Sequence, residues 1–291
     1  MRMMMNRVWL QKSAAILDMK NSSSCFMRLY GRGMASLSGG QKVEELAKQL
    51  PFKNAIRYEH KNQKYSFKDI NQHSEDLACG FLEQGFQPGD IVLSWLPEHF
   101  SEQTVLQFAC SKAGFILYSL DPSQAILDPQ GAKTSLKLSL EVTKANILIT
   151  QEAGSDVNYV RLCKEVIPEI RLWDFGTGLP FFSPRFPHLR YPVHTGFDHT
   201  NKTGMIPYND MLIPSGELKS HLREHPPLDG TTPLYGTLQF SSVNSEATDG
   251  ISLTLGKVYS NDEVVQNNVW PIYNDILNQN YKEIPGVGNI W

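Results

Sequence analysis

The chain has 291 residues, of which 41% are hydrophobic, and its formal net charge is -3. This length and composition allow one large domain, or two modest ones, with a proper core. A near-neutral chain without a Lys/Arg patch among aromatic residues is not typical of a nucleic-acid-binding protein, so no nucleic-acid partner is expected. No apolar run approaches the roughly 20 residues that a spanning helix needs. Membrane contact is therefore expected only through partner proteins.

The first forty residues differ in composition from the rest of the chain. Asp18 is their one acidic residue, serines are frequent, and the basic residues are Arg2, Arg7, Lys12, Lys20, Arg28 and Arg32. This composition is typical of a mitochondrial transit peptide, and Arg7 and Lys12 interrupt the apolar run that a secretory signal needs. We predict a transit-like segment over residues 1–40, with a disordered basic tail as the alternative, and an α/β domain over 41–291. Cleavage of the segment stays open.

The next residues predict a helix, a strand region and a second helix. Hydrophobic spacing indicates helices over 41–50 and 68–85, and residues 53–67 alternate as strands do. Gly85 is expected to end the second helix as a C-terminal cap. The turn Gln87-Pro88-Gly89-Asp90 then leads into a short apolar run, Ile91 to Leu96, which is typical of a buried strand.

Helices and strands alternate further along the chain. Helices are predicted over 98–113, 130–144 and 155–166, and strands over 115–120 and 146–150. This alternation predicts an α/β fold with a largely parallel sheet and flanking helices.

The second half has weaker patterns. Residues 174–235 are rich in Pro, Gly and His and predict long connections with short strands, and residues 236–243 predict a buried strand that enters a loop. Residues 262–280 predict a helix interrupted at Pro271. The aromatic and apolar residues Trp270, Pro271, Ile272, Tyr273, Ile290 and Trp291 can fold onto the domain's own core or bind a partner, and both readings stay open.

Several residues suggest chemistry but lack the required context. Cys25, Cys79, Cys110 and Cys163 form no CxxC pair, so we predict buried structural thiols and neither a zinc site nor a disulfide framework. The histidines His188, His194 and His199, with Asp198, match no zinc spacing and are expected to be loop or surface residues. No metal site is predicted.

Two glycine pairs and two serines are also expected to be structural. Gly176 and Gly178, like Gly286 and Gly288, do not sit between a strand and a helix as a dinucleotide-binding motif requires, and are predicted to lie in turns. Ser241 and Ser242 lack a G-x-S-x-G context. No catalytic or cofactor-binding residue, and no cofactor, is therefore assigned.

Four segments of the chain form a recognisable series. They are Tyr65-Ser66-Phe67 with the later Gln87-Pro88-Gly89-Asp90, then Leu96-Pro97-Glu98 with Lys112-Ala113-Gly114, then Leu120-Asp121-Pro122, and finally Ala145-Asn146-Ile147-Leu148-Ile149-Thr150. Together they resemble the acyl-CoA synthetase, or AMP-binding, family of adenylate-forming ligases. Their order and spacing across residues 53–170 carry the resemblance. The stretches 190–196 and 204–208 resemble the part of the family that precedes its phosphate loop. The resemblance implies the fold of the N-terminal subdomain of these ligases.

The phosphate-loop segment departs from the family pattern. The family reads roughly Q-F-T-S-G-T-T-G-x-P-K-G, whereas residues 239–250 read QFSSVNSEATDG. Val243 and Glu246 stand at glycine positions, Thr248 replaces the proline, and Asp249 replaces the lysine. A phosphate-binding loop needs glycines for close backbone approach and positive φ, and valine resists that conformation. Two carboxylates near a triphosphate would each be repulsive by roughly 1 kcal/mol even in a water-like dielectric.

The resemblance covers about the first half of a ligase's large domain. In the family, the adenine-contacting segment, the hinge and the C-terminal domain with the catalytic lysine follow the phosphate loop, whereas this sequence reaches Trp291 soon after it. We therefore expect no adenylation or thioester formation. The predicted function is that of a structural accessory subunit, bound to other protein subunits of a mitochondrial complex of the respiratory-chain or ATP-synthase type. The alternatives are a module that binds acyl groups, CoA or a nucleotide, and one half of a split ligase.

Overall fold

The computed structural model describes residues 36–152, 157–196, 204–224, 228–245 and 248–285. Predictions for residues before 36, including Cys25 and most of the transit-like segment, lie outside this range, as do those for Asp198, His199, Gly286, Gly288, Ile290 and Trp291. Among the described helices, none is long and apolar enough to cross a bilayer.

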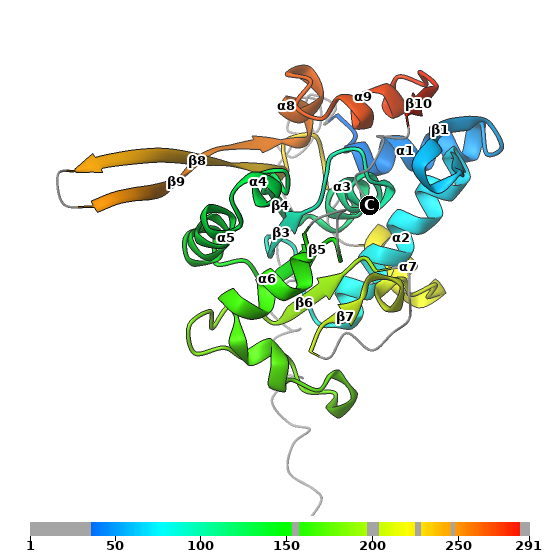
Figure 1. Ribbon diagram of the computed structural model, residues 1–291. Coiled ribbons are helices and arrows are strands. Elements are labelled where there is room, and N and C mark those ends of the chain that lie inside the picture. The colour runs from blue at the N-terminus through cyan, green and yellow to red at the C-terminus, as the bar shows by residue number, and fades with distance from the viewer. Residues whose placement is uncertain (1–35, 153–156, 197–203, 225–227, 246–247, 286–291) are drawn as a thin grey trace, which may run out of the picture. The chain divides into compact units, whose positions relative to one another are not determined.

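A seven-stranded sheet forms the centre of the fold (Figure 1). Its strand order is β7-β6-β5-β3-β4-β8-β9, and every neighbouring pair is parallel except β8 and β9. The bounds are β3 Ile91–Trp95, β4 Ile116–Ser119, β5 Ile147–Thr150, β6 Tyr191–His194, β7 Ile206–Pro207, β8 Pro233–Ser245 and β9 Thr248–Ser260. The predicted α/β class with a largely parallel sheet is confirmed.

Helices cover both faces of this sheet because its strands are apolar on both sides. In β5, Ile147 and Ile149 point into one core, and Leu148 points into the other, as the period of two requires. The first core lies under α1 Gly39–Gln49, α2 Phe67–Glu83 and α3 Ser101–Ala113. The second lies under α4 Gln124–Leu127, α5 Pro129–Thr143 and α6 Tyr159–Val166.

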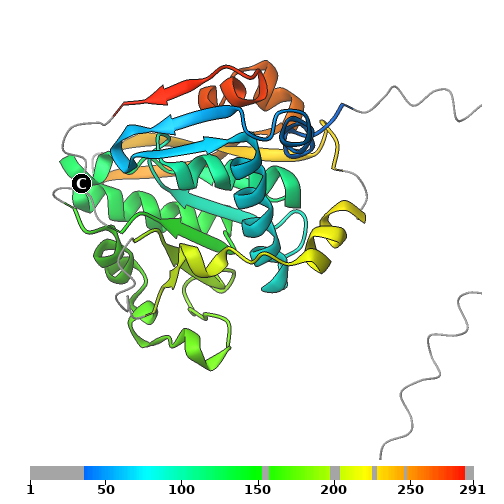
Figure 2. The same ribbon diagram turned by 90° about the vertical axis from the view of Figure 1, so that its right-hand side faces the viewer.

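A small second sheet lies beside the first three helices (Figure 2). It contains β1 Asn54–Tyr58 and β2 Gln63–Ser66, which form an antiparallel hairpin around a 3-10 turn, Glu59–Lys61. The third strand, β10 Lys282–Ile284, pairs with β1 in parallel. The region 53–67, predicted as strand from its alternation, therefore contains two strands. The third strand of the sheet, β10, comes from the far end of the described chain.

Local signals placed the helix ends well. Ser38 caps α1 with a capping box, since its side chain accepts from the Gln41 amide while Gln41 accepts from the Ser38 amide. The helix thus begins at Gly39, two positions before the predicted start. Gly85 follows α2 with φ of 78°, the left-handed conformation expected of a glycine at a helix C-terminus.

The segment 174–235 contains one element that the sequence pattern did not predict. The short strands β6 and β7 are present as expected, but residues Gly216–Glu224 form the helix α7. Part of this segment also covers the second core, because Phe181, Phe186, Leu189 and Met205 are buried in it. Gly176 and Gly178 lie in a short 3-10 turn, where Gly178 has φ of 69°, as predicted for a turn.

The aromatic residues near Pro271 fold onto the domain's own core. Pro271 begins α9 Pro271–Leu277 and separates it from α8 Asn261–Gln266, so the predicted interruption is confirmed. Trp270 is 4% exposed and Tyr273 is fully buried, with its ring stacked on Phe108 at 4.2 Å. For these residues, the choice between core and partner is settled in favour of the core.

The three described cysteines, Cys79, Cys110 and Cys163, are free and buried, as predicted. Burial raises the pKa of Cys79 to about 11 and that of Cys163 to about 12, and also raises the pKa of Cys110. These thiols therefore stay protonated and unreactive at mildly alkaline pH. We expect iodoacetamide to label all three only after denaturation, as read by peptide mass spectrometry. Labelling of any of them in the folded chain at the rate of a free thiol would contradict the burial.

Candidate functional site

The segment that resembles the family's phosphate loop forms the end of a β-hairpin. Strands β8 and β9 pair antiparallel up to the pairs Val243 with Gly250, Asn244 with Asp249, and Ser245 with Thr248. Only residues 246–247 separate the two strands. The backbone amides of this segment are arranged in a β-ladder, whose geometry differs from the turns that direct several successive amides to one anion.

This hairpin arm, formed by β8 and β9, extends beyond α4 and α5 (Figure 1). Paired residues on neighbouring strands share a face, so Leu238 and Leu255 lie on the same side as Phe240 and Leu253. Leu253 is 8% exposed, and β9 packs against α5, whereas Phe240 is 41% exposed and Leu255 44%. The strand predicted to be buried over 236–243 is therefore half-exposed. The prediction was wrong because only the first residues of β8 lie inside the parallel sheet, next to β4.

The predicted histidine cluster does not form a described site. His188 is exposed, but His194 is 1% exposed at the end of β6, so its assignment to a loop or the surface was wrong. The strand Tyr191–His194 is buried on both faces, which carries the histidine into the interior. Within the described residues, no group of three or more His, Cys, Asp or Glu side chains is placed to hold a metal ion. Ser241 is an exposed strand residue of the hairpin arm.

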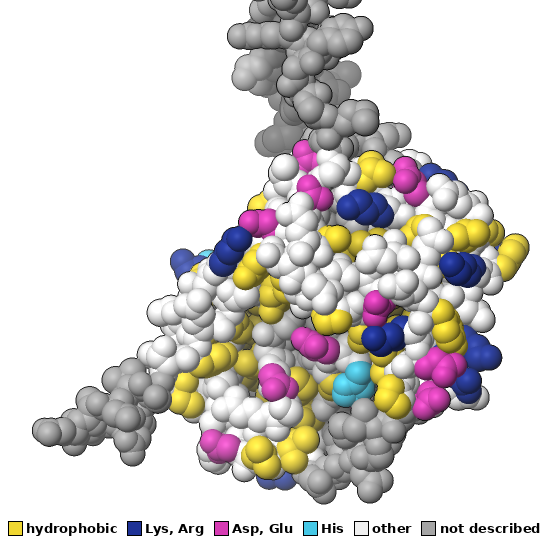
Figure 3. Space-filling model, turned by 90° about the horizontal axis from the view of Figure 1, so that it is seen from above, with side chains coloured by type: hydrophobic (Ala, Val, Ile, Leu, Met, Phe, Trp, Pro, Cys, Tyr) yellow, Lys and Arg dark blue, Asp and Glu magenta, His cyan; other side chains and the backbone are white. Residues whose placement is uncertain are grey.

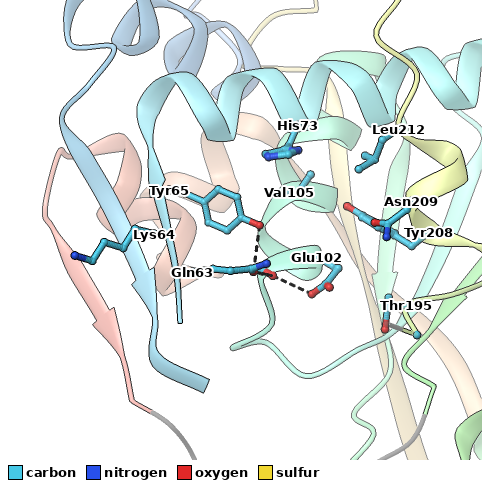
Figure 4. Close-up of a pocket in the computed structure, with 12 residues that line it drawn as sticks. Gln63, Lys64, Tyr65, His73, Glu102, Val105, Thr195, Tyr208, Asn209 and Leu212 are labelled. Carbon is cyan, nitrogen blue, oxygen red and sulfur yellow. Dashed lines mark hydrogen bonds between the residues drawn. The ribbon is translucent and has the colours of Figure 1, made fainter. Parts of the chain in front are cut away.

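A cavity of about 340 Å³ opens between the small sheet and the main domain (Figure 4). Its lining comes from four separate stretches of chain: β2 with the adjoining α2, helix α3, the residues after β6, and the 3-10 turn Tyr208–Met211 with Leu212. Tyr65, His73 and Glu102 lie on one side, and Tyr208 and Asn209 lie opposite. The sequence carries no signal for this site, because its members share no motif and meet only through the fold.

A buried ion pair stands at one wall of the cavity. Lys61 Nζ bonds both carboxylate oxygens of Glu102, and their side chains are 3% and 13% exposed. Burial lowers the pKa of Lys61, and the neighbouring Glu102 carboxylate opposes that shift. The pair neutralises its own charge, so the cavity does not present an isolated carboxylate to a ligand.

Two tyrosine hydroxyls supply hydrogen-bonding groups to the cavity. The Tyr65 hydroxyl donates to Gln63 Oε1 at 3.4 Å, while the buried Tyr208 hydroxyl has no hydrogen-bond partner among the described residues. Burial, and then the negative charge of Glu102, hold the pKa of Tyr208 well above its usual value, and burial also raises that of Tyr65. Both hydroxyls are therefore donors at neutral pH. This arrangement suits binding of a small polar group.

The fold is shared with adenylate-forming enzymes of known structure. The luciferase-like enzyme of the nonluminescent mealworm Zophobas morio aligns over 85% of this chain and 54% of its own, with a TM-score of 0.58 at 12% identity. Acetoacetyl-CoA synthetase from Streptomyces lividans aligns over 85% of this chain and 38% of its own, with a TM-score of 0.54 at 14% identity. The class is therefore that of the N-terminal part of an adenylate-forming enzyme fold.

The sequence is also similar to known enzymes. Residues 43–173 match the model of the AMP-binding enzymes. The Bacillus subtilis protein YngI, whose name describes it as an acyl-CoA synthetase, is 23% identical over 227 residues, which are 76% of this chain and 38% of YngI. Human medium-chain acyl-CoA ligase ACSF2, named as mitochondrial, is 20% identical over 78% of this chain and 35% of its own length. The chain thus matches little more than a third of each of these two relatives.

Proposed function

We propose that the chain is a catalytically inactive, acyl-CoA synthetase-like protein that serves as a structural accessory subunit of a mitochondrial complex. The complex would be of the inner-membrane respiratory-chain or ATP-synthase type, with the subunit on the matrix side or associated with the inner membrane. Its partners would be other protein subunits of that complex.

The observation that carries the proposal is the regular β-ladder where the resemblance implies a phosphate-binding loop. The pairing of Val243 with Gly250 and of Asn244 with Asp249 commits this backbone to interstrand hydrogen bonding. The sequence also places Val243 and Glu246 at glycine positions and Asp249 at the lysine position. Backbone geometry and charge both oppose binding of a triphosphate.

Two further features support the mitochondrial part of the proposal. The first forty residues have the composition of a transit peptide, and the ACSF2 relatives are named as mitochondrial. The β9 edge of the sheet and the exposed Phe240 and Leu255 offer surface for a neighbouring subunit.

Calorimetry with Mg-ATP tests the loss of nucleotide binding. We expect no heat of binding at micromolar to millimolar ATP, and no ATP–pyrophosphate exchange with medium-chain fatty acids, while purified human ACSF2 measured alongside serves as the positive control. Micromolar affinity for Mg-ATP would overturn the proposed inactivity. Exchange activity that appears only with a copurifying partner would favour a split ligase instead.

Native fractionation of mitochondria tests the structural role. We expect the chain to migrate with a large assembly after mild detergent extraction, together with stoichiometric partner subunits. Migration as a free monomer would contradict an accessory-subunit function.

The cavity beside Tyr208 favours a second candidate, a module that binds an acyl, CoA or nucleotide ligand. The Tyr208 hydroxyl has no hydrogen-bond partner in the part of the chain that the structure describes, and a ligand could satisfy it, because a buried unsatisfied donor costs stability. A rise in melting temperature with CoA or an acyl-AMP analogue, diminished in Tyr208→Phe, would favour this function over scaffolding.

A further inference from the structure

The connection between α6 and β6 exposes an unusual number of large apolar side chains. Leu172 is 89% exposed, Leu179 67%, Phe182 66% and Phe175 42%, all within eleven positions of sequence. We call residues 172–182 the apolar loop. The green segment that contains it forms the lower end of the described domain in both Figure 1 and Figure 2. Single exposed apolar residues are ordinary, but a group of four on one projecting loop indicates an interaction surface.

The apolar loop is held in place from the inside. The Trp173 indole Nε1 donates to the Leu179 carbonyl at 3.0 Å, and its ring packs against Phe181 at 5.6 Å and Tyr191 at 6.2 Å. Phe181 is 3% exposed and belongs to the second core. Asp174 also accepts from the Gly176 amide at 2.9 Å. Because these contacts fix the backbone, the neighbouring Leu172, Leu179 and Phe182 cannot turn into the core that Trp173 and Phe181 already fill.

Basic residues surround the base of this loop. Arg185 donates to the Val166 carbonyl at the end of α6 at 3.3 Å, and Lys164 lies in the last turn of the same helix. Burial and the nearby positive charge of Arg171 lower the pKa of Lys164, as expected when cations lie close together. None of these three cations has a carboxylate partner among the described residues. The adjacent Glu165 is bound by Lys133 and Arg161 instead.

We propose that the apolar loop docks the protein on the surface of an anionic phospholipid bilayer, with Leu172, Leu179 and Phe182 in the acyl-chain boundary and Lys164, Arg171 and Arg185 at the lipid phosphates. Apolar and aromatic side chains bordered by Lys and Arg are the composition of interfacial membrane anchors. The loop projects outward, and a bilayer admits projecting side chains where a protein partner would need a matching pocket. The inference revises the expectation of membrane contact through partners alone, and it does not depend on the inactivity proposed above.

Vesicle cosedimentation of the full chain tests this inference. We expect binding to vesicles of equal parts phosphatidylcholine and phosphatidylserine, weaker binding to phosphatidylcholine alone, and loss of binding at high salt. The triple variant Leu172→Ser/Leu179→Ser/Phe182→Ser should bind at least about tenfold more weakly, since each buried apolar side chain contributes on the order of a tenfold factor. Circular dichroism of the variant should match the parent chain, because all three side chains are exposed.

The matched control is Phe52→Ser/Leu127→Ser, which removes two apolar side chains that are 83% and 90% exposed outside the loop. It carries the same basic first forty residues, so any difference from the triple variant reports the loop itself.

A second variant, Arg171→Gln/Arg185→Gln, should reduce the preference for anionic vesicles. Equal sedimentation of the triple variant and the control would overturn the inference. The inference would also be overturned if the parent chain did not bind vesicles and the triple variant lost a protein that copurifies with the parent chain. That result would assign the loop to a protein partner.

Discussion

Replacing Glu102 by alanine is expected to lower the free energy of unfolding by about 3–5 kcal/mol, the usual cost of leaving a buried charge without its partner. Lys61 is 3% exposed at its side chain and has both carboxylate oxygens of Glu102 as partners. Ser101 Oγ at 3.4 Å and the Phe100 ring at 5.1 Å also contact Lys61, and neither carries a negative charge that could replace the carboxylate. Loss of the carboxylate therefore weakens the stabilisation of the buried ammonium.

The double variant Lys61→Met/Glu102→Leu distinguishes two contributions to the free energy of unfolding: the cost of an unpaired buried charge and the net contribution of the ion pair. It removes both charges and keeps apolar volume, so it should recover most of the lost stability, because buried ion pairs are often replaceable by packed apolar residues. Glu141→Ala is the surface control: its side chain is 40% exposed, it pairs with Lys137 at 3.9 Å, and its loss should stay within about 0.5 kcal/mol. Urea unfolding followed by circular dichroism measures all three. A Glu102→Ala change no larger than that of Glu141→Ala would contradict the buried-pair description.

Tyr273→Ala is expected to cost about 3–5 kcal/mol, the range for removing a large aromatic side chain from a core. Tyr273 is fully buried, stacks on Phe108 of α3 at 4.2 Å, and contacts Trp270 edge-on at 5.4 Å. Because α9 packs against α3 and α1, loss of this ring should loosen the C-terminal helices from the first core. β10, which follows α9 and pairs with β1, should become more accessible with it.

Denaturant unfolding and hydrogen exchange over residues 261–285 measure this effect. Phe52→Ala is the control, since Phe52 is 83% exposed, and the change should be within about 0.5 kcal/mol. If Tyr273→Ala left the isolated chain as stable as the control and weakened only its association with other proteins, residues 270–273 would be a partner surface and their place in the core would be wrong.

The alternation of helices and strands could be predicted from the sequence because each of these elements carries its own local signal. Gly85, Pro88 and Gly89 mark a helix end and a turn, and the apolar runs of β3, β4 and β5 are short and bounded, as buried parallel strands are. The helix α7 was missed because only nine residues, Gly216–Glu224, form it, within a Pro- and His-rich stretch of weak periodicity. For so short a helix, neighbouring elements decide the conformation more than propensity does.

The sequence by itself determined the α/β class, the similarity of residues 43–173 to AMP-binding enzymes, and the replacement of glycines and of the lysine in the phosphate-loop segment. Each of these features depends on residues that are close together along the chain. Only the tertiary structure decided that this segment ends a projecting hairpin, that His194 is interior, and that Tyr65, Glu102 and Tyr208 border one cavity. These facts depend on contacts between distant segments, whose free energy comes from burial and charge pairing after the chain has folded, and no local pattern encodes them.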